Sequence, residues 1–181
     1  MDTQKIALLW IGLCLSISAE AQHQVNIKKG SIRAFSTLSP GKMLHSSNHY
    51  FYGHGGLEYY FEKNRSASGD TYFMLGSSNP KTSQFMFNHS TFFGVNQHFI
   101  SGNSDFYVGL HPGMAITKLN LTEEPHTGVN PLVSSTIGYN LYFFKHLHFF
   151  VQSRLILGKH GMDRPEKLGE IRFSAGLGLN Y

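Results

Sequence analysis

Apolar and polar residues alternate with a period of two along the final segment of the chain. From Ile171 to Tyr181 every odd position is apolar or aromatic, whereas every even position from Glu170 to Asn180 is polar or glycine. A helix with this pattern would carry polar groups on every face, but a β-strand sorts the two kinds of residue onto two faces. The pattern therefore predicts a strand over residues 170–181.

The same alternation predicts seven further strands upstream. Their expected ranges are 31–38, 49–63, 70–77, 84–99, 105–118, 131–143 and 146–158. Connections after the first, third, fifth and seventh strands are long and rich in Ser, Pro, Gly, Lys and Glu, whereas those after the fourth and sixth are tight. Residues 64–69 are the exception, a longer turn on the tight side. We expect an all-β fold, an eight-stranded antiparallel up-and-down barrel.

Charged residues of these strands fall on the face opposite the apolar one. A soluble barrel directs its polar face to water, whereas a transmembrane β-barrel directs its apolar face to lipid and its polar face inward. The apolar face also carries an aromatic residue near the tight-turn end of seven strands, as expected for a girdle at a membrane interface. These aromatic residues are Phe61, Phe73, Phe99, Phe106, Phe143, Phe149 and Tyr181. The pattern favours a transmembrane barrel.

Residues 1–21 have the three parts of a secretory signal. Lys5 precedes an apolar run over residues 6–17, and Ala19-Glu20-Ala21 forms a cleavage site. The run is shorter than the roughly 20 residues that a membrane-spanning helix needs. We therefore expect a cleaved signal peptide over residues 1–21 and a barrel domain over residues 22–181.

The parity of a residue, that is, its odd or even position in the alternation of its strand, places six charged residues inside the expected barrel. They are Arg33, Glu58, Glu62, Arg154, Glu170 and Arg172. Eight strands enclose a bore that side chains just fill. We hypothesise that Glu58 and Glu170 pair with some of the three arginines and form a polar plug. Paired carboxylates could instead serve acid–base catalysis, but arginine neighbours would hold them ionised and occupied.

Composition adds no sign of other chemistry. The net charge of +4 is modest and spread over loops, so no nucleic-acid partner is expected. The only cysteine, Cys14, lies in the signal segment, which leaves no thiolate ligand. The eleven histidines lack the spacing of a known metal site, and we expect them on loops and rims. No catalytic, cofactor or metal residue is predicted.

Three segments resemble the small outer-membrane β-barrel family of Gram-negative bacteria, of OmpA/OmpX-type size. They are residues 94–99, residues 109–113 and the ending from Gly176 to Tyr181. The resemblance implies a monomer in the outer membrane, in contact with membrane lipid and lipopolysaccharide. It also implies insertion by the outer-membrane assembly machinery, with Tyr181 as the terminal aromatic signal. It implies a structural, envelope or surface-interaction role and no catalysis.

One short motif keeps an enzymatic alternative open. His45-Ser46-Ser47-Asn48 resembles the H-x-S-N pattern of lipid A deacylases, which are also eight-stranded outer-membrane barrels. The resemblance implies Ser47 as nucleophile, His45 as base and Glu58 as orienting acid. That family carries its motif on a late strand, whereas here it lies in the first long connection. A carrier of a small hydrophobic ligand is a third alternative.

Overall fold

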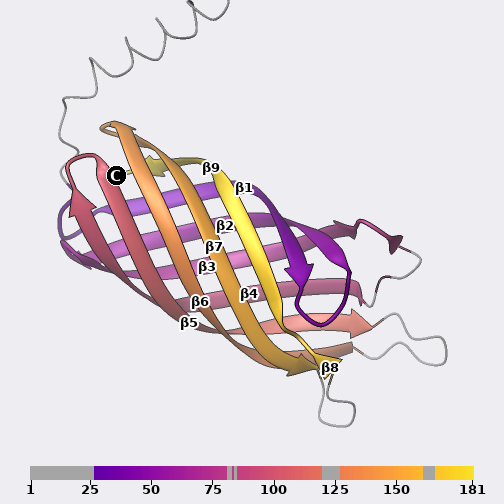
Figure 1. The fold of residues 1–181 in the computed structure, drawn as a ribbon. Helices are drawn as coiled ribbons and strands as arrows, with labels where there is room; N and C mark the ends of the chain where they lie inside the picture. Colours follow the sequence, from indigo (N-terminus) through magenta and orange to yellow (C-terminus); the bar gives the residue numbers. More distant parts are fainter. Residues whose placement is uncertain (1–26, 81–82, 84, 120–126, 161–165) are drawn as a thin grey trace, which may run out of the picture.

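Eight long antiparallel strands close into a barrel in the computed structural model (Figure 1), which describes residues 27–80, 83, 85–119, 127–160 and 166–181. The expected signal peptide, residues 1–21, lies outside these ranges. The strands are β1 (Ile32–Met43), β2 (His49–Glu62), β3 (Arg65–Ser77), β4 (Phe85–Ser101), β5 (Ser104–Leu119), β6 (Thr127–Phe144), β7 (Leu147–His160) and β9 (Glu170–Asn180). The predicted fold class is confirmed.

Each strand pairs with the next along the chain, and β9 pairs with both β7 and β1, which closes the sheet. A two-residue strand, β8 (Glu166–Lys167), extends the pairing of β7. Tight turns at residues 63–64, 102–103 and 145–146 lie at one end of the barrel, here called the turn end. The opposite end, from which the longer connections leave, is called the loop end (Figure 1). No helix long and apolar enough to cross a membrane occurs in the described residues.

The outer wall of the barrel is apolar, and the inner wall is largely polar. On β5, the side chain of Leu110 is 60% exposed, whereas the adjacent His111 is 1% exposed. On β6, Ile137 is 56% exposed and the adjacent Thr136 is 2% exposed. A water-soluble barrel cannot expose so many large apolar side chains in a continuous band. The outer wall therefore has the character of a surface in contact with lipid.

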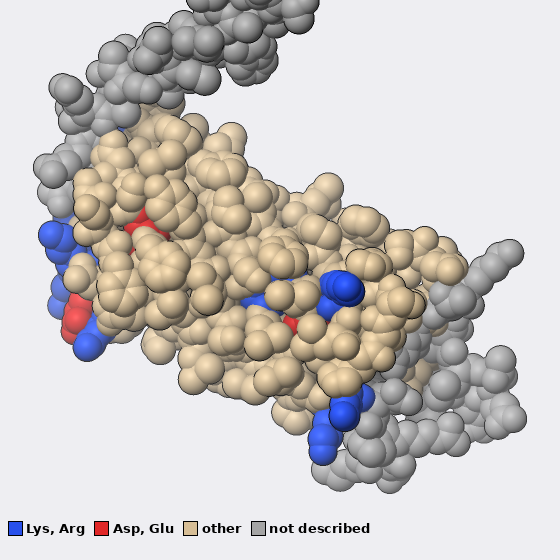
Figure 2. Space-filling model, viewed as in Figure 1, with Lys and Arg blue, Asp and Glu red and all other residues tan. Residues whose placement is uncertain are grey.

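Charged side chains on the outer surface gather near the two ends. Figure 2 shows a largely uncharged wall between clusters of Lys and Arg. Of the acidic side chains that the structure describes, only Glu62 is exposed, and it lies at the turn end. The uncharged wall is thus bounded by basic residues where a membrane would meet water.

The structure corrects the predicted turn at residues 64–69. Strand β3 begins at Arg65, so the connection after β2 is as tight as the other two at this end. Residues 66–69 are Ser, Ala, Ser and Gly, and the alternation of apolar and polar residues is weak among such small side chains. Phe73 consequently pairs with Gly53, in the loop-end half of β2, and does not belong to the turn-end girdle. Glu62 is exposed and contacts Arg65 at 3.7 Å, so its predicted interior position is also wrong.

Two further differences from the prediction are local, one at the end of β1 and one at the start of β4. Strand β1 extends to Met43, beyond the predicted end at residue 38. Gly41 was part of an apparent turn signal, but a Cβ there would lie 2.9 Å from the Tyr52 ring, so the residue is small because the interior is crowded. A register shift between Phe85 and Phe87 turns Phe85 inward, although the alternation over residues 84–99 would place it on the outer face with Phe99.

Glycine relieves crowding in this narrow bore at Gly138. A Cβ added there would collide with the Tyr107 ring, which lies across the glycine from the neighbouring strand. Gly102 serves a different purpose, because its φ of 58° allows the tight turn between β4 and β5.

Placing arginine on the outer wall tests the assignment of that surface. We expect Leu110→Arg to lower the free energy of unfolding in lipid by about 2–4 kcal/mol, because Leu110 lies near the middle of β5. Val129→Arg, at the loop end of β6, is the matched control and should cost about 0–1 kcal/mol. Denaturant unfolding in phospholipid vesicles measures both. Equal costs at the two positions would contradict a lipid-facing wall.

Candidate functional site in the barrel interior

Buried polar and charged side chains occupy the interior from the turn end to beyond the middle of the barrel. Three arginines and four carboxylates are each at most 4% exposed. They are Arg33, Arg154, Arg172, Glu58, Asp70, Asp105 and Glu170. Because charges in such a narrow space are stable only when paired and hydrogen-bonded, their contacts determine what the interior can do.

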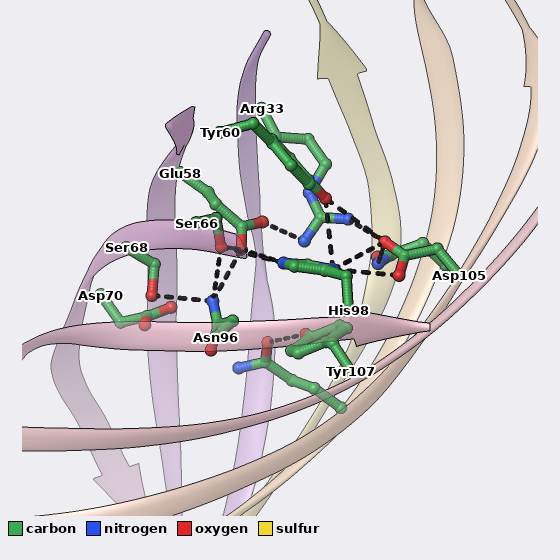
Figure 3. A network of polar contacts seen from close by, with 12 residues as sticks. Arg33, Glu58, Tyr60, Ser66, Ser68, Asp70, Asn96, His98, Asp105 and Tyr107 are labelled. Atoms are coloured by element: carbon green, nitrogen blue, oxygen red, sulfur yellow. Dashed lines mark hydrogen bonds and ion pairs between the residues drawn. The ribbon is translucent and has the colours of Figure 1, made fainter. Parts of the chain in front are cut away.

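The turn-end network is centred on His98 (Figure 3). Its Nε2 lies 3.0 Å from Glu58, and its Nδ1 lies 2.9 Å from Asp105. Arg33 forms an ion pair with Glu58 and contacts Asp105 at 3.2 Å. These four residues come from β1, β2, β4 and β5, so the network ties half of the barrel wall together.

Neutral side chains complete the hydrogen bonding of the two carboxylates. Asn96 donates to Glu58 at 2.6 Å, and Ser66 donates to the same carboxylate. Asn140 and Tyr142 donate to Asp105 at 2.9 and 3.2 Å. A carboxylate with several donors and a cation around it is a stabilised buried anion, and it has little capacity left for a ligand.

Ser66, His98 and Asp105 lie at the distances of a nucleophilic triad. The Ser66 hydroxyl is 2.9 Å from His98 Nε2, and His98 Nδ1 is 2.9 Å from Asp105. A working triad needs a hydroxyl that is free to attack and open to substrate. Ser66 is completely buried and donates its proton to Glu58. The arrangement therefore lacks the access and the free nucleophile that catalysis needs.

A second network lies at mid-barrel around Asp70. Arg154 contacts this carboxylate at 2.5 Å, and His54 Nε2 contacts it at 3.1 Å. Arg154 also donates to Ser134 at 2.9 Å, and His54 Nδ1 lies 2.9 Å from the Ser174 hydroxyl. The network joins β2 and β3 to β6, β7 and β9 across the bore.

The third network holds Arg172 nearest the loop end. Its guanidinium contacts Glu170 at 2.7 Å and donates to Ser90 at 2.7 Å. It also lies over the Tyr52 ring, 3.8 Å from the centroid, and 4.6 Å from that of Tyr72. Cation–π contacts of this kind stabilise an arginine where few hydrogen-bond acceptors are present.

An apolar and aromatic cluster of buried side chains begins beside Arg154 and Arg172 and extends to the loop end of the bore. It consists of Met43, Tyr50, Tyr52, Tyr72, Phe85, Phe92, Ala115, Leu119, Leu132, Ile156 and Leu168. Between the turn-end and mid-barrel networks, the cavity that Arg33, Asp70 and Arg154 help to line has a volume of about 10 Å³. That space suits one water molecule.

Positive and negative charges in the interior are equal in number when His98 is protonated. Carboxylates accept hydrogen bonds and do not donate them, so His98 satisfies both Glu58 and Asp105 when both of its ring nitrogens carry hydrogen. The imidazolium then joins the three arginines opposite four carboxylates. Of the described residues, no group of three or more His, Cys, Asp and Glu side chains is arranged to hold a metal ion.

The structure places the predicted interior charges Arg33, Glu58, Arg154, Glu170 and Arg172 inside the barrel. It pairs Glu58 with Arg33 and Glu170 with Arg172, whereas Arg154 pairs with a carboxylate that sequence reasoning did not assign. That carboxylate, Asp70, begins the predicted strand over residues 70–77 and shares its parity with the interior residue Tyr72, so the alternation already indicated its position. Asp105 likewise shares the parity of Tyr107.

The expectation that the histidines lie on loops and rims is wrong for four of them. His54, His98, His111 and His148 are each at most 1% exposed. Each of the four lies at a position with the inward parity of its strand, so the alternation itself indicated that it would be buried. An imidazole suits a narrow polar bore because it is flat and can use both nitrogens.

The residues of the H-x-S-N motif do not assemble with Glu58. His45 and Ser47 are exposed in the connection between β1 and β2 at the loop end. Glu58 pairs in register with Arg33 near the turn end and is buried in the His98 network. A deacylase-like triad of these three residues is therefore not formed.

In sequence, the chain matches no protein-family profile and no curated protein. Its fold is similar to solved barrels of low identity. Neisserial surface protein A has a TM-score of 0.67 at 11% identity, with 85% of this chain and 98% of that chain covered. The N-terminal β-barrel domain of Pseudomonas aeruginosa OprF has a TM-score of 0.57 at 13% identity, with 84% and 98% covered.

A third neighbour is Ail, the attachment invasion locus protein of Yersinia pestis. Its TM-score is 0.54 at 14% identity, and 84% of this chain and 99% of that chain are covered. All three comparisons concern the fold, and they agree with the closed sheet and the apolar outer wall described above. The chain thus has the fold of the small eight-stranded outer-membrane β-barrels.

Proposed function

We propose that this chain is an integral outer-membrane protein with a filled, charge-balanced interior, and that it acts through its envelope position and its loops. The observation that carries the proposal is the series of buried side chains along the bore, in the three polar networks and the loop-end apolar cluster. A conducting or transporting barrel needs a connected aqueous path, and the cavity of about 10 Å³ between two of the networks has room for one water molecule only.

Two other functions have less support. A carrier of a hydrophobic ligand needs an interior cavity of several hundred Å³, whereas the cavity that Arg33 and Arg154 help to line has a volume of about 10 Å³. A lipid-modifying enzyme needs a nucleophile, a base and an acid in contact, and Ser47 and His45 lie at the opposite end of the barrel from Glu58. The non-enzymatic role is therefore the better supported one.

The outer surface supports membrane lipid, including lipopolysaccharide, as the principal partner. Its apolar wall is bounded at both ends by basic side chains. The terminal Tyr181 is 70% exposed on that wall, which supports its proposed role as a signal to the assembly machinery. Two neighbours are named for surface and attachment properties, which supports a surface-interaction role for the loop end here.

Heat modifiability of the protein in outer-membrane fractions tests the location and the fold together. We expect the protein in the outer-membrane fraction, with a change in electrophoretic mobility when samples in SDS are boiled, because a closed barrel resists SDS until heated. Recovery in the soluble periplasmic fraction without a mobility change would contradict the proposal.

Conductance tests the filled interior. Protein that shows the heat-dependent mobility change is reconstituted into a planar lipid bilayer in chloride solution. We expect no stepwise current, because Arg33, Arg154 and Arg172 occupy successive levels of the bore with their partners. Reproducible current steps from the folded protein would show an open path and overturn the proposed filling.

Removing a buried carboxylate tests the structural role of the interior charges. We expect Glu170→Ala to lower the free energy of unfolding by about 3–5 kcal/mol, because it leaves the buried Arg172 without its anion. Glu62→Ala is the matched control, since its contact with Arg65 is exposed, and it should cost less than about 1 kcal/mol. Denaturant unfolding in vesicles compares the two. A Glu170 variant as stable as the control would refute the role.

A further inference from the structure

An open groove lies on the outer wall at the loop end, between β6, β7 and the segment that joins β8 to β9. Its volume is about 660 Å³. Val133 and Leu157 form an apolar part of its lining, and Lys159 and Lys167 lie at its outer edge. None of these four residues belongs to the three polar networks, although Leu132 of the loop-end apolar cluster also lines the groove.

The two lysines are direct partners in the ladder. Lys159 on β7 pairs in register with Lys167 on β8, and both side chains are exposed. Like charges directly opposite each other on neighbouring strands destabilise a sheet. An anion placed between the two ammonium groups would reverse the sign of this interaction.

His45 adds a third nitrogen-bearing side chain to the same place. Its ring lies over Gly169, where an added Cβ would be only 3.0 Å from the ring. Leu44 donates a backbone hydrogen bond to Gly169, which fixes the first long connection against this edge of the barrel. Glycine at position 169 therefore allows the imidazole to lie within the groove lining.

The described surroundings provide no exposed carboxylate for these cations. Among the acidic residues whose side chains are described, Glu170 is nearby but buried, with Arg172 as its partner. The exposed Glu62 lies at the other end of the barrel. Among the side chains that the structure describes, the groove therefore combines two exposed lysines with apolar walls and no exposed carboxylate.

The apolar walls indicate what kind of anion fits. Val133 and Leu157 are 45% and 48% exposed, and they belong to the same outer face as the lipid-facing wall. A soluble anion would gain nothing from these side chains, whereas a lipid can place acyl carbon against them and its headgroup phosphate at the lysines.

We propose that His45, Lys159 and Lys167 bind the phosphate of a phosphorylated lipid in the leaflet at the loop end, with its acyl chain against Val133 and Leu157. The phosphate oxygens accept hydrogen bonds from the two ammonium groups and from the imidazole. The proposal rests on the membrane location proposed above. It assigns to a defined groove the lipid contact that the apolar wall makes only in general.

Native mass spectrometry of the protein purified from outer membranes in mild detergent tests this site. The probes are bisphosphorylated lipid A and its dephosphorylated form with the same acyl chains. We expect the wild-type protein to bind the phosphorylated form about tenfold more tightly. The double variant Lys159→Gln, Lys167→Gln should lose this preference. The charge-matched control Lys28→Gln, Lys29→Gln changes two exposed lysines at the turn end and should keep it.

Three results would overturn the site. They are equal binding of the two lipid forms by the wild-type protein, the same loss of preference in the control variant, and displacement of lipid A by inorganic phosphate at comparable concentration. Heat modifiability is measured on every variant. A wild-type protein that keeps its mobility change and membrane location but shows no preference for the phosphorylated lipid disproves the site and leaves the proposed function standing. A wild-type protein that is absent from the membrane disproves both.

Discussion

The narrow bore of an eight-stranded barrel is the constraint on which the rest of this structure depends. Side chains just fill such a bore, so each inward position faces several others across the axis. Charges placed there must be neutralised within reach, and Arg33, Asp70 and Arg172 each have partners at 3.2 Å or less. The small residue at Gly138 follows from the same constraint, because Tyr107 occupies the space of its missing side chain.

Alternation along the chain predicts this fold well because lipid and interior impose opposite requirements on successive residues. The strands near the C-terminus follow the predicted parity closely, as Phe173 and Leu177 on the outer wall and Arg172 inside illustrate. The pattern failed where small residues obscured it, at the start of β3, and where a bulge reversed it, at Phe85. Parity specifies the face on which a residue lies and leaves its cross-barrel partner undetermined.

The partner of each interior charge across the barrel therefore could not be predicted from the sequence. Arg154 could have paired with any interior carboxylate by parity, and its contact with Asp70 depends on how the tilted strands bring distant positions to one level. The prediction of exposed histidines was wrong for a different reason, because it followed composition, whereas the alternation already placed His54 and His98 on the inner face. The groove beside Gly169 was also invisible in the sequence, because it depends on the pairing of β8 with β7.

The closure of β9 against β1 has a consequence for the order in which the molecule is assembled. Arg33 on β1 contacts Asp105 on β5 and Tyr142 on β6, and His54 contacts Ser174, which lies 120 positions later in the chain. These contacts are non-local, and contacts of high sequence separation form slowly because loop entropy opposes them. Until the sheet curves and closes, contacts across the bore such as Arg154 with Asp70 and His54 with Ser174 are not formed. Partly formed barrels are therefore less stable than the closed one, and the interior contacts favour a cooperative, all-or-none final step of insertion.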